Sequence, residues 1–180
     1  MNEAVFRPAT AGDVAAIVAL LADDVLGAAR ENPGDPVYDA AFAAIAADPN
    51  QLLAVAELDG RVVGCLQLSF MPGLSHRGAW RGQVESVRVA GDQRGSGLGR
   101  RMMAWAMEQC RARGCRLVQL TTDKSRADAR RFYESIGFVA SHEGMKRAIV
   151  SAPVSSRTHN RLRNGPHDLG RNVLLTAAIP

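Results

Sequence analysis

The sequence predicts an α+β fold in which about four helices flank a mixed, mostly antiparallel central sheet. Two β-rich runs, LLAVAEL and RVVGCLQLSF, are joined by Asp59-Gly60, a residue pair that strongly favours a two-residue hairpin turn. A third run, QVESVRV, is followed by a glycine-rich turn, an amphipathic helix and the strand-like run LVQLTT. Because this strand–helix–strand order is typical of a parallel pair, we expect parallel and antiparallel strands in one sheet.

The N-terminal part of the chain is predicted to supply one strand and two helices. AVFRPAT has the composition of a short strand. Thr10 to Asp13 resembles a capping box, with Asp in place of Glu, and precedes the apolar-periodic stretch AIVALLADDVLGAAR, residues 16–30. The turn-rich ENPGDP interrupts this helix, and Pro36 can start a second helix through DAAFAAIAAD, which DPN ends.

The C-terminal part of the predicted domain begins after the loop MPGLSHRGAWRG, with a strand over residues 83–89. The glycine-rich turn that follows starts a helix that we expect to run to Gly114. DARRFYESIGF predicts a short helix that Gly137 ends, and FVASHEGMKRAIV, residues 138–150, predicts a final strand or hairpin.

The composition of the chain changes abruptly at Ser151. With 180 residues and 47% hydrophobic content, the chain can bury one substantial core. We therefore predict one domain over residues 1–150 and a polar, Arg-containing appendage over residues 151–180, in which NVLLTAAI could still pair or pack. No apolar run approaches the roughly 20 residues of a membrane helix, and the chain starts without a signal-peptide pattern, so we expect a cytoplasmic protein with no membrane partner.

The charge of the chain argues against a nucleic-acid-binding protein, and its cysteines and histidines argue against a metal-binding one. The net charge is +4, but four of the 22 basic residues and one of the 18 acidic residues lie in 151–180, which leaves the rest of the chain close to neutral. A body so near neutrality has no broad electrostatic surface for nucleic acid. The three cysteines and four histidines show no metal-ligand spacing, so we expect reduced cysteines and no metal site.

The stretch QRGSGLGRR predicts a site for an anion. Gly95, Gly97 and Gly99 alternate, and Arg100 stands where a dinucleotide-binding fingerprint needs its third glycine. No lysine follows the glycines as a Walker loop requires. What remains is a strand end, a glycine turn with outward N–H groups and a helix N-terminus, which together favour phosphate. Each charge-assisted hydrogen bond there contributes about 1.5–3 kcal/mol, more than the roughly 0.3–1 kcal/mol of the helix dipole.

This glycine turn resembles the coenzyme A pyrophosphate loop of the GNAT acyltransferases, through the pattern Arg94-x-x-Gly97-x-Gly99. RPAT, LDGRVVG, LVQLTTD and the run from Ala129 through Phe132-Tyr133 to Gly137-Phe138 match the family in the same order. The resemblance covers about residues 4 to 150. It implies a sheet splayed in the middle, acetyl-CoA as cosubstrate, and acetyl transfer to an amine by direct attack inside the split between strands.

The resemblance also implies which residues hold the cofactor. The pyrophosphate would lie on the turn formed by Arg94, Gly95, Ser96, Gly97, Leu98, Gly99 and Arg100. Val87 and Val89 would pair with the pantetheine amides through their backbone groups. Many relatives carry Asn where this chain has Arg126, so Arg126 either meets a phosphate instead or belongs to a solvated basic helix face.

Proton transfer is the physical problem of the implied reaction, because a primary amine with a pKa of about 10.4 is almost entirely protonated at pH 7. Glu85 is the candidate base, since glucosamine-phosphate relatives also carry glutamate there. Histone-type and aminoalkylphosphonate relatives place it two residues earlier, at Gln83. Glu85 could instead simply pair with Arg81 or Arg88.

Tyr133 is the candidate acid for the departing thiolate. Its ordinary pKa near 10 keeps it protonated at pH 7, while that of a thiol lies near 8.5. On the predicted helix, Tyr133 sits about 100° around from Phe132, so it can border a cleft while Phe132 faces the core. The alternative is a boundary aromatic residue whose hydroxyl is merely hydrogen-bonded.

The acceptor is the least determined part of the prediction. The order of the motifs resembles aminoalkylphosphonate N-acetyltransferases and similar small-amine enzymes, so we expect a small-molecule amine. The alternatives are a protein lysine or N-terminal acetyltransferase and a non-enzymatic acyl-CoA-binding module. His76, Arg77, Trp80 and Arg81 in the central loop either hold an anionic acceptor or are solvated loop residues. A homodimer is possible.

Overall fold

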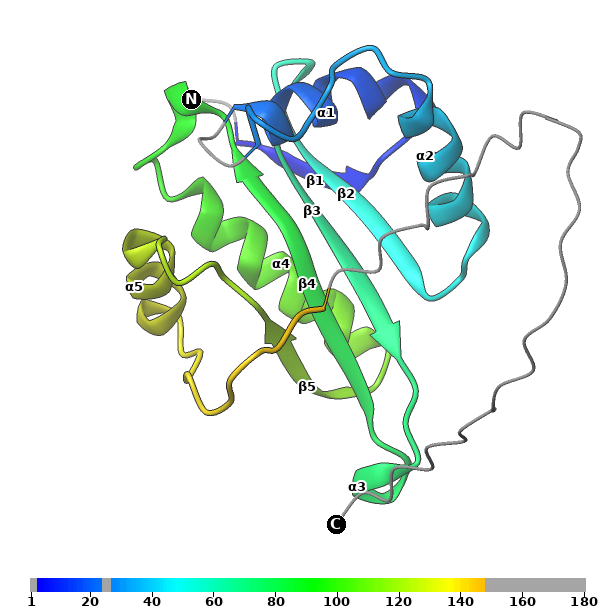
Figure 1. Cartoon of the computed structure of the whole chain (residues 1–180), viewed down its shortest axis with the longest axis vertical. Helices are drawn as coiled ribbons and strands as arrows, with labels where there is room; N and C mark the ends of the chain where they lie inside the picture. The colour runs from blue at the N-terminus through cyan, green and yellow to red at the C-terminus, as the bar shows by residue number, and fades with distance from the viewer. Residues whose placement is uncertain (1–2, 24–26, 148–180) are drawn as a thin grey trace, which may run out of the picture. The chain divides into compact units, whose positions relative to one another are not determined.

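A five-stranded sheet forms the centre of the computed structural model, which describes residues 3–23 and 27–147. Its order is β1 (Val5–Pro8), β2 (Gln51–Leu58), β3 (Arg61–Met71), β4 (Trp80–Val89) and β5 (Cys115–Leu120) (Figure 1). Neighbouring strands are antiparallel from β1 to β4, whereas β4 and β5 are parallel. The mixed, mostly antiparallel sheet is therefore confirmed.

The helices of the described residues lie between these strands in the chain, except α5, which follows β5. They are α1 (Val14–Ala22), which follows a 3-10 turn η1 (Ala11–Asp13), then α2 (Val37–Ala47), α3 (Ser75–Gly78), α4 (Leu98–Ala112), which follows the 3-10 turn η2 (Gly91–Gln93), and α5 (Ala127–Ser135). In the short α3, His76 and Arg77 have positive φ, so this segment is an irregular turn rather than a regular helix. Four regular helices remain, in agreement with the prediction.

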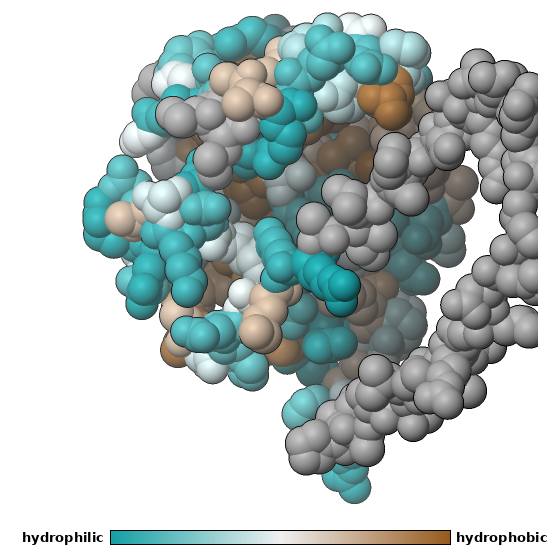
Figure 2. Space-filling model, in the orientation of Figure 1, coloured by the Kyte–Doolittle hydropathy of each residue, from teal (hydrophilic) through white to brown (hydrophobic). Residues whose placement is uncertain are grey.

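The chain divides into a compact unit over Met1–Gly144 and a second unit over Met145–Pro180. Of the second unit only residues 145–147 are described, so the predicted appendage at 151–180 lies outside the described residues. Among the helices of the described part, none has the length and apolarity needed to cross a membrane. The face seen in Figure 2 is mostly hydrophilic, with apolar residues scattered between polar ones.

Helix α4 packs against β3, β4 and β5 and fixes the geometry of the site (Figure 1). Its buried side chains Met102 and Met103 join a core that includes Leu66 and Leu68 of β3. A Cβ on Gly64 would lie 2.7 Å from Met102 Sδ, and one on Gly82 would overlap Cys110 Sγ. Glycine at both positions therefore lets α4 approach the sheet closely, which sets where its N-terminus lies.

The hairpin and the helix start predicted from local sequence are confirmed. Asp59 and Gly60 both have positive φ, as the predicted turn requires, and Leu58 pairs with Arg61. Thr10 and Asp13 form the capping box, in which the Asp13 carboxylate accepts hydrogen bonds from the backbone N–H and the hydroxyl of Thr10. The structure adds Arg7, which donates two hydrogen bonds to the same carboxylate.

The predicted first helix is too long. It ends at Ala22, where the prediction extended it to Arg30, and residues 27–30 form a turn. Asp23 ends the helix, and both its carbonyl and its carboxylate accept hydrogen bonds from Arg94, which lies 71 residues further along the chain. The apolar period alone therefore does not fix where the helix ends.

Two strand boundaries also differ from the prediction. β4 begins at Trp80 rather than residue 83, because Arg81 and Gly82 pair with the extended end of β3. The predicted strand over 138–150 is wrong as far as residue 147, where no strand forms, and residues 148–150 lie outside the described part. Val139 is 81% exposed, so this stretch lacks the buried face that a strand of the sheet needs.

Candidate active site

The sheet opens between β4 and β5. Parallel pairing runs from Trp80 opposite Cys115 to Val84 opposite Leu120 and then stops. β4 continues, still paired with β3, to Val89. The edge of β4 beyond Val84 is therefore not paired with β5, and the predicted splay in the middle of the sheet is confirmed.

A bulge changes the direction of the side chains along this open edge. Gly82 and Val84 face α4, so alternation directs Glu85 to the opposite face of the sheet. Ser86 has φ of 54°, and the register between β3 and β4 shifts near it. Beyond the bulge, Val89 faces α4, because its Cγ2 lies 3.8 Å from where a Cβ of Gly99 would be. The side chain of Arg88 therefore starts from the same face as Glu85.

The glycine turn links β4 to α4 with the geometry expected of an anion site. Gly95 and Gly97 have φ of 83° and 81°, a conformation that disfavours other residues, and a Cβ on either would meet nothing within 4 Å. The first backbone hydrogen bond of this turn into α4 runs from Arg101 N to Gly97 O, at 3.2 Å. The N–H groups of Gly99 and Arg100 precede it and so have no helical acceptor. The turn therefore has backbone N–H donors at the start of α4 and open space beside its glycines.

Two arginines of the turn, Arg94 and Arg100, donate hydrogen bonds to other groups of the chain. Arg94 Nη2 donates to the carbonyl and the carboxylate of Asp23, at 3.0 and 2.9 Å. Arg100 donates to the hydroxyl of Ser135 at 3.2 Å, which connects the start of α4 to the end of α5. Their predicted contacts with pyrophosphate stay predictions, as do those of Ser96, which donates to Gln93 O, and of Leu98, whose side chain is buried.

Arginine side chains also reach the two carbonyls predicted to bind the pantetheine. Arg88 Nη1 donates to Val87 O at 2.9 Å, and Arg94 Nε donates to Val89 O at 3.2 Å. The guanidinium N–H groups thus stand where amide N–H groups of a cofactor would have to donate. Both carbonyls are accessible to a donor at the open edge of β4, which the proposed cofactor role requires.

Tyr133 lies on α5, half-buried and packed against two phenylalanines. Its ring centroid is 5.2 Å from that of Phe132 and 5.9 Å from that of Phe138, both in edge-on arrangements. Burial raises the pKa of Tyr133, although the positive charges of Arg126 and Arg88 oppose this change. The hydroxyl therefore keeps its proton at neutral pH, as a general acid must.

The remaining candidate residues lie on or beside three separate elements. Glu85 is exposed on β4 opposite Gln67. Arg126 is the N-cap residue of α5, and its charge acts on Tyr133. His76 and Arg77 are exposed in the irregular turn, which agrees better with solvated loop residues than with an anion site.

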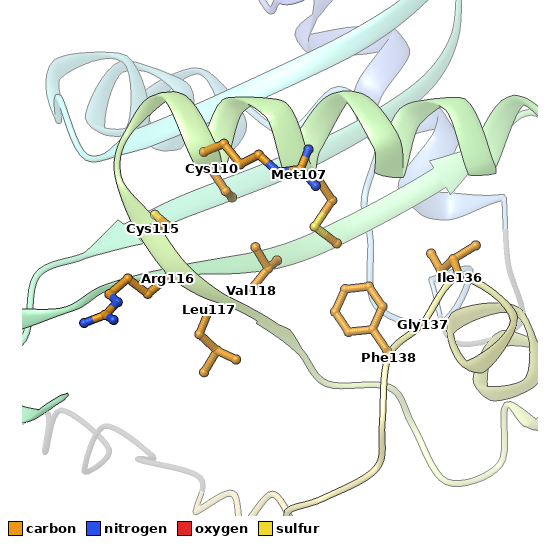
Figure 3. Close-up of a pocket in the computed structure, with 10 residues that line it drawn as sticks. Met107, Cys110, Cys115, Arg116, Leu117, Val118, Ile136, Gly137 and Phe138 are labelled. Carbon is orange, nitrogen blue, oxygen red and sulfur yellow. The ribbon is translucent and has the colours of Figure 1, made fainter.

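A cavity of about 280 Å³ lies elsewhere, between α4, β5 and the end of α5 (Figure 3). It contains none of the predicted site residues. Burial raises the pKa of the Cys110 thiol to about 11 and also raises that of Cys115, so neither thiol is a ready nucleophile at neutral pH. Within the described residues, no group of three or more His, Cys, Asp or Glu side chains could hold a metal ion. The split, rather than this cavity, carries the candidate chemistry.

Sequence reasoning missed the place of Arg88, which was considered only as a partner of Glu85. The signal available was an arginine between two valines of a strand, in VRV. Its position in the split depends on the bulge at Ser86, which the local sequence did not indicate.

Comparisons with known proteins agree with this geometry. The model of the acetyltransferase (GNAT) family matches residues 16–138. The chain is 36% identical over 108 residues to the aminoalkylphosphonate N-acetyltransferase of Salmonella typhimurium, covering 60% of this chain and 70% of that protein. It is 33% identical over 87 residues to the glucosamine 6-phosphate N-acetyltransferase of Trypanosoma brucei brucei, covering 48% and 57%. A crystal structure described as a transcriptional regulator from Bacillus halodurans superimposes with a TM-score of 0.78 and 47% identity, covering 81% of this chain and 99% of that one.

Proposed function

This chain belongs to the GNAT acetyltransferase family, and on that premise we propose that it transfers the acetyl group of acetyl-CoA to a primary amine of a small molecule. The observation that carries the proposal is Tyr133, a half-buried proton donor on α5, in a fold whose β4 strand has an unpaired edge and leads into a glycine turn. The names of the two relatives both denote transfer to a small amine that also carries a phosphorus oxyanion.

The proposed reaction is a direct attack. The lone pair of the amine nitrogen forms a bond to the thioester carbon, and the bond between that carbon and sulfur breaks. Tyr133 supplies the proton that the leaving thiolate takes, and the nitrogen loses its proton through water to Glu85. The N–H groups at the start of α4 and the carbonyls of Val87 and Val89 hold the cofactor in line for this attack.

The proposed function is tested by measuring free-thiol release from acetyl-CoA with a panel of small amines and peptides. Turnover with small amines and none with peptides supports the proposal. Turnover with peptides alone would identify a protein acetyltransferase, and acetyl-CoA binding without any turnover would identify a binding module.

Gly97→Ala is expected to raise the Kd for acetyl-CoA at least about 10-fold. A Cβ at Gly97 would project into the space where the pyrophosphate approaches, and alanine also disfavours the φ of 81°. Gly60→Ala is the matched control, since Gly60 has φ of 76° and equally open space at the tip of a hairpin. Calorimetric titration should show a change only for Gly97. A Kd within about threefold of wild type, or about 0.65 kcal/mol, would remove the proposed phosphate site.

Glu85→Gln is expected to steepen the rise of kcat/KM with pH between about pH 7 and 9. Without a base, only amine that is already neutral in solution reacts, and its fraction grows about tenfold per pH unit below the pKa. Glu108→Gln, which removes an exposed carboxylate that pairs with Arg111 on α4, is the control and should leave the profile unchanged. Identical profiles for Glu85→Gln and wild type would exclude Glu85 as the base.

A further inference from the structure

Five polar side chains form a strip across the face of the sheet opposite α4. Gly82 faces α4, so Gln83 after it points to the other face of β4. Ser69 of β3 lies opposite Gln83, and the register extends this row to β2 on one side and to β5 on the other, strands that lie side by side in Figure 1. Gln67 lies opposite Glu85, which points to the same face. We call these side chains the polar strip: Gln51, Gln67, Ser69, Gln83 and Gln119.

Hydrogen bonds within the polar strip occupy one half of each carboxamide. Gln51 Oε1 accepts from Gln67 Nε2 at 3.0 Å and from Ser69 Oγ at 2.8 Å. Gln119 Nε2 donates to Gln83 Oε1 at 2.9 Å. Among the described residues, the amide nitrogens of Gln51 and Gln83 have no other partner. The same holds for the amide oxygens of Gln67 and Gln119, so both donors and acceptors remain for a ligand.

These unused groups are accessible although the side chains of the polar strip are half-buried. None of the unused carboxamide groups is a fully buried atom left without a partner, so a ligand in solvent can reach them. Four of the six glutamines of the chain lie here, on strands, where β-branched and aromatic residues are usually enriched. Strand formation alone does not explain this composition.

The polar strip ends where the split begins. Gln83 and Gln119 are paired one position before the last pair of β4 and β5. Glu85, the proposed base, follows Gln83 by two residues on the same face, a distance of about 7 Å along the strand. An acceptor bound on the polar strip would therefore have its amine beside Glu85 and the open edge of β4.

No charged side chain belongs to the polar strip. Along β4, Arg81 precedes Gln83 and Glu85 follows it on the same face, so charges of both signs flank the strip. Arg88 starts from this face as well, beyond the bulge. Recognition on the polar strip itself therefore depends on hydrogen bonds.

The presence of both donors and acceptors selects the chemistry of the ligand. A hydroxyl group donates and accepts, so a ligand with several hydroxyls can satisfy the nitrogens and the oxygens of the polar strip together. A carboxylate or a phosphonate alone only accepts and cannot satisfy the oxygens of Gln67 and Gln119. An alkyl chain would remove water from all of these groups without replacing its hydrogen bonds, which is unfavourable.

We propose that the polar strip is the acceptor-binding surface, and that the acceptor is a small molecule whose primary amine is attached to a hydroxyl-rich chain or ring. This inference rests on the proposed function and names its substrate class. The row from Gln51 to Gln119 spans about 14 Å, three spacings between neighbouring strands, which bounds the size of the hydroxyl-rich part. With its hydroxyls on the polar strip and its amine beside Glu85, the acceptor is oriented for direct attack on the thioester.

The test compares glucamine with hexylamine, which share a chain length and a primary amine and differ in the hydroxyls. kcat/KM is measured for both and expressed per molecule of neutral amine, because the hydroxyls lower the pKa of the amine. We expect wild type to prefer glucamine at least about 10-fold. Gln83→Met and Gln119→Met each remove one carboxamide and keep the length of the side chain. Each should lower the ratio of glucamine to hexylamine by about 3- to 10-fold.

This ratio separates recognition of the acceptor from a general loss of rate. A disturbance of Glu85 by Gln83→Met affects both acceptors and cancels in the ratio, and Gln119→Met acts from the neighbouring strand. The matched control is Gln109→Met, which replaces a half-buried glutamine of α4 and should leave the ratio unchanged. A wild-type ratio in both folded variants of the polar strip overturns the inference, while acetylation of hexylamine leaves the proposed function standing.

A binding measurement makes the result independent of turnover. Glucitol, which lacks the amine, is titrated into the CoA-saturated protein while NMR records the side-chain NH₂ signals of the glutamines. The signals of Gln51 and Gln83 should shift, and that of Gln109 should not. Such shifts support the polar strip as a polyol site even if no amine is acetylated, in which case only the proposed function fails. No shift at Gln51 and Gln83, or an equal shift at Gln109, overturns the inference.

Discussion

Tyr133→Phe is expected to lower kcat by about 10² to 10⁴-fold, with the KM for acetyl-CoA nearly unchanged. The substitution keeps the ring that packs against Phe132 and Phe138 and removes only the proton donor. A leaving thiolate that receives no proton in the transition state is a poor leaving group, so the chemical step should slow while binding survives. Steady-state kinetics and acetyl-CoA titration of both proteins measure the two effects separately.

The pH dependence gives an independent check on the same role. An acid must be protonated to act, and burial raises the pKa of Tyr133 above its usual value of 10. Wild-type kcat should therefore show no decline from loss of this proton until the pH exceeds about 10. If folded Tyr133→Phe keeps more than about a third of wild-type kcat while chemistry is rate-limiting, Tyr133 is structural and water protonates the thiolate.

Asp13→Asn is expected to lower the free energy of unfolding by about 2–4 kcal/mol, the largest stability change that we predict. The Asp13 side chain is only 9% exposed and accepts hydrogen bonds from Arg7 Nη1 and Nη2 at 2.7 and 2.9 Å. Breaking a buried pair costs about 3–5 kcal/mol, and the figure here is smaller because Arg7 is 32% exposed and also pairs with Glu57. Urea unfolding should show a midpoint lower by about 1–2 M.

Acid should reproduce this loss in the wild-type protein. The hydrogen bonds from Arg7, followed by those from Thr10, hold the pKa of Asp13 well below its ordinary value of 3.8. A depressed carboxylate pKa stabilises the fold fully above the unfolded value, and the contribution is lost as the pH falls below about 4 toward the folded value. Wild type should therefore lose its advantage over Asp13→Asn in that range.

The control for this experiment is Asp92→Asn. Asp92 pairs with Arg61, and both side chains are more than half exposed, so solvent screens the pair. Asp92→Asn should unfold almost as wild type does. An equal loss of unfolding free energy for the two substitutions would mean that the network around Arg7 and Asp13 stabilises the fold no more than an exposed ion pair does.

Several features of the fold could be predicted from the sequence because short-range physics decides them. The hairpin at Asp59-Gly60 needs only two residues that tolerate positive φ. The helix start at Thr10 to Asp13 needs side chains that reach backbone N–H groups three residues away. The glycine turn before α4 also forms where the sequence predicted it, and the structure adds that Gly95 and Gly97 have positive φ.

The candidate site was predicted only in part. Family resemblance predicted Tyr133 as the acid and the glycine turn as the phosphate site, and both roles stay predictions. The structure shows that the turn joins β4 to α4 and that Tyr133 is half-buried on α5. The position of Arg88 could not be predicted, because it depends on the bulge at Ser86 and on the register of β4 against β3. A one-residue change of register turns every following side chain to the other face, and the local sequence holds no sign of it.

The sequence by itself therefore determined the mixed sheet, its hairpin, the capping box at Thr10 to Asp13 and the glycine turn before α4. Only the tertiary structure decided that Arg94 lies beside Asp23 at the end of α1, across 71 residues of chain. It also decided that pairing between β4 and β5 stops at Val84 and Leu120, which opens the split. Both outcomes depend on contacts between residues far apart in the chain, whose energies no local pattern contains.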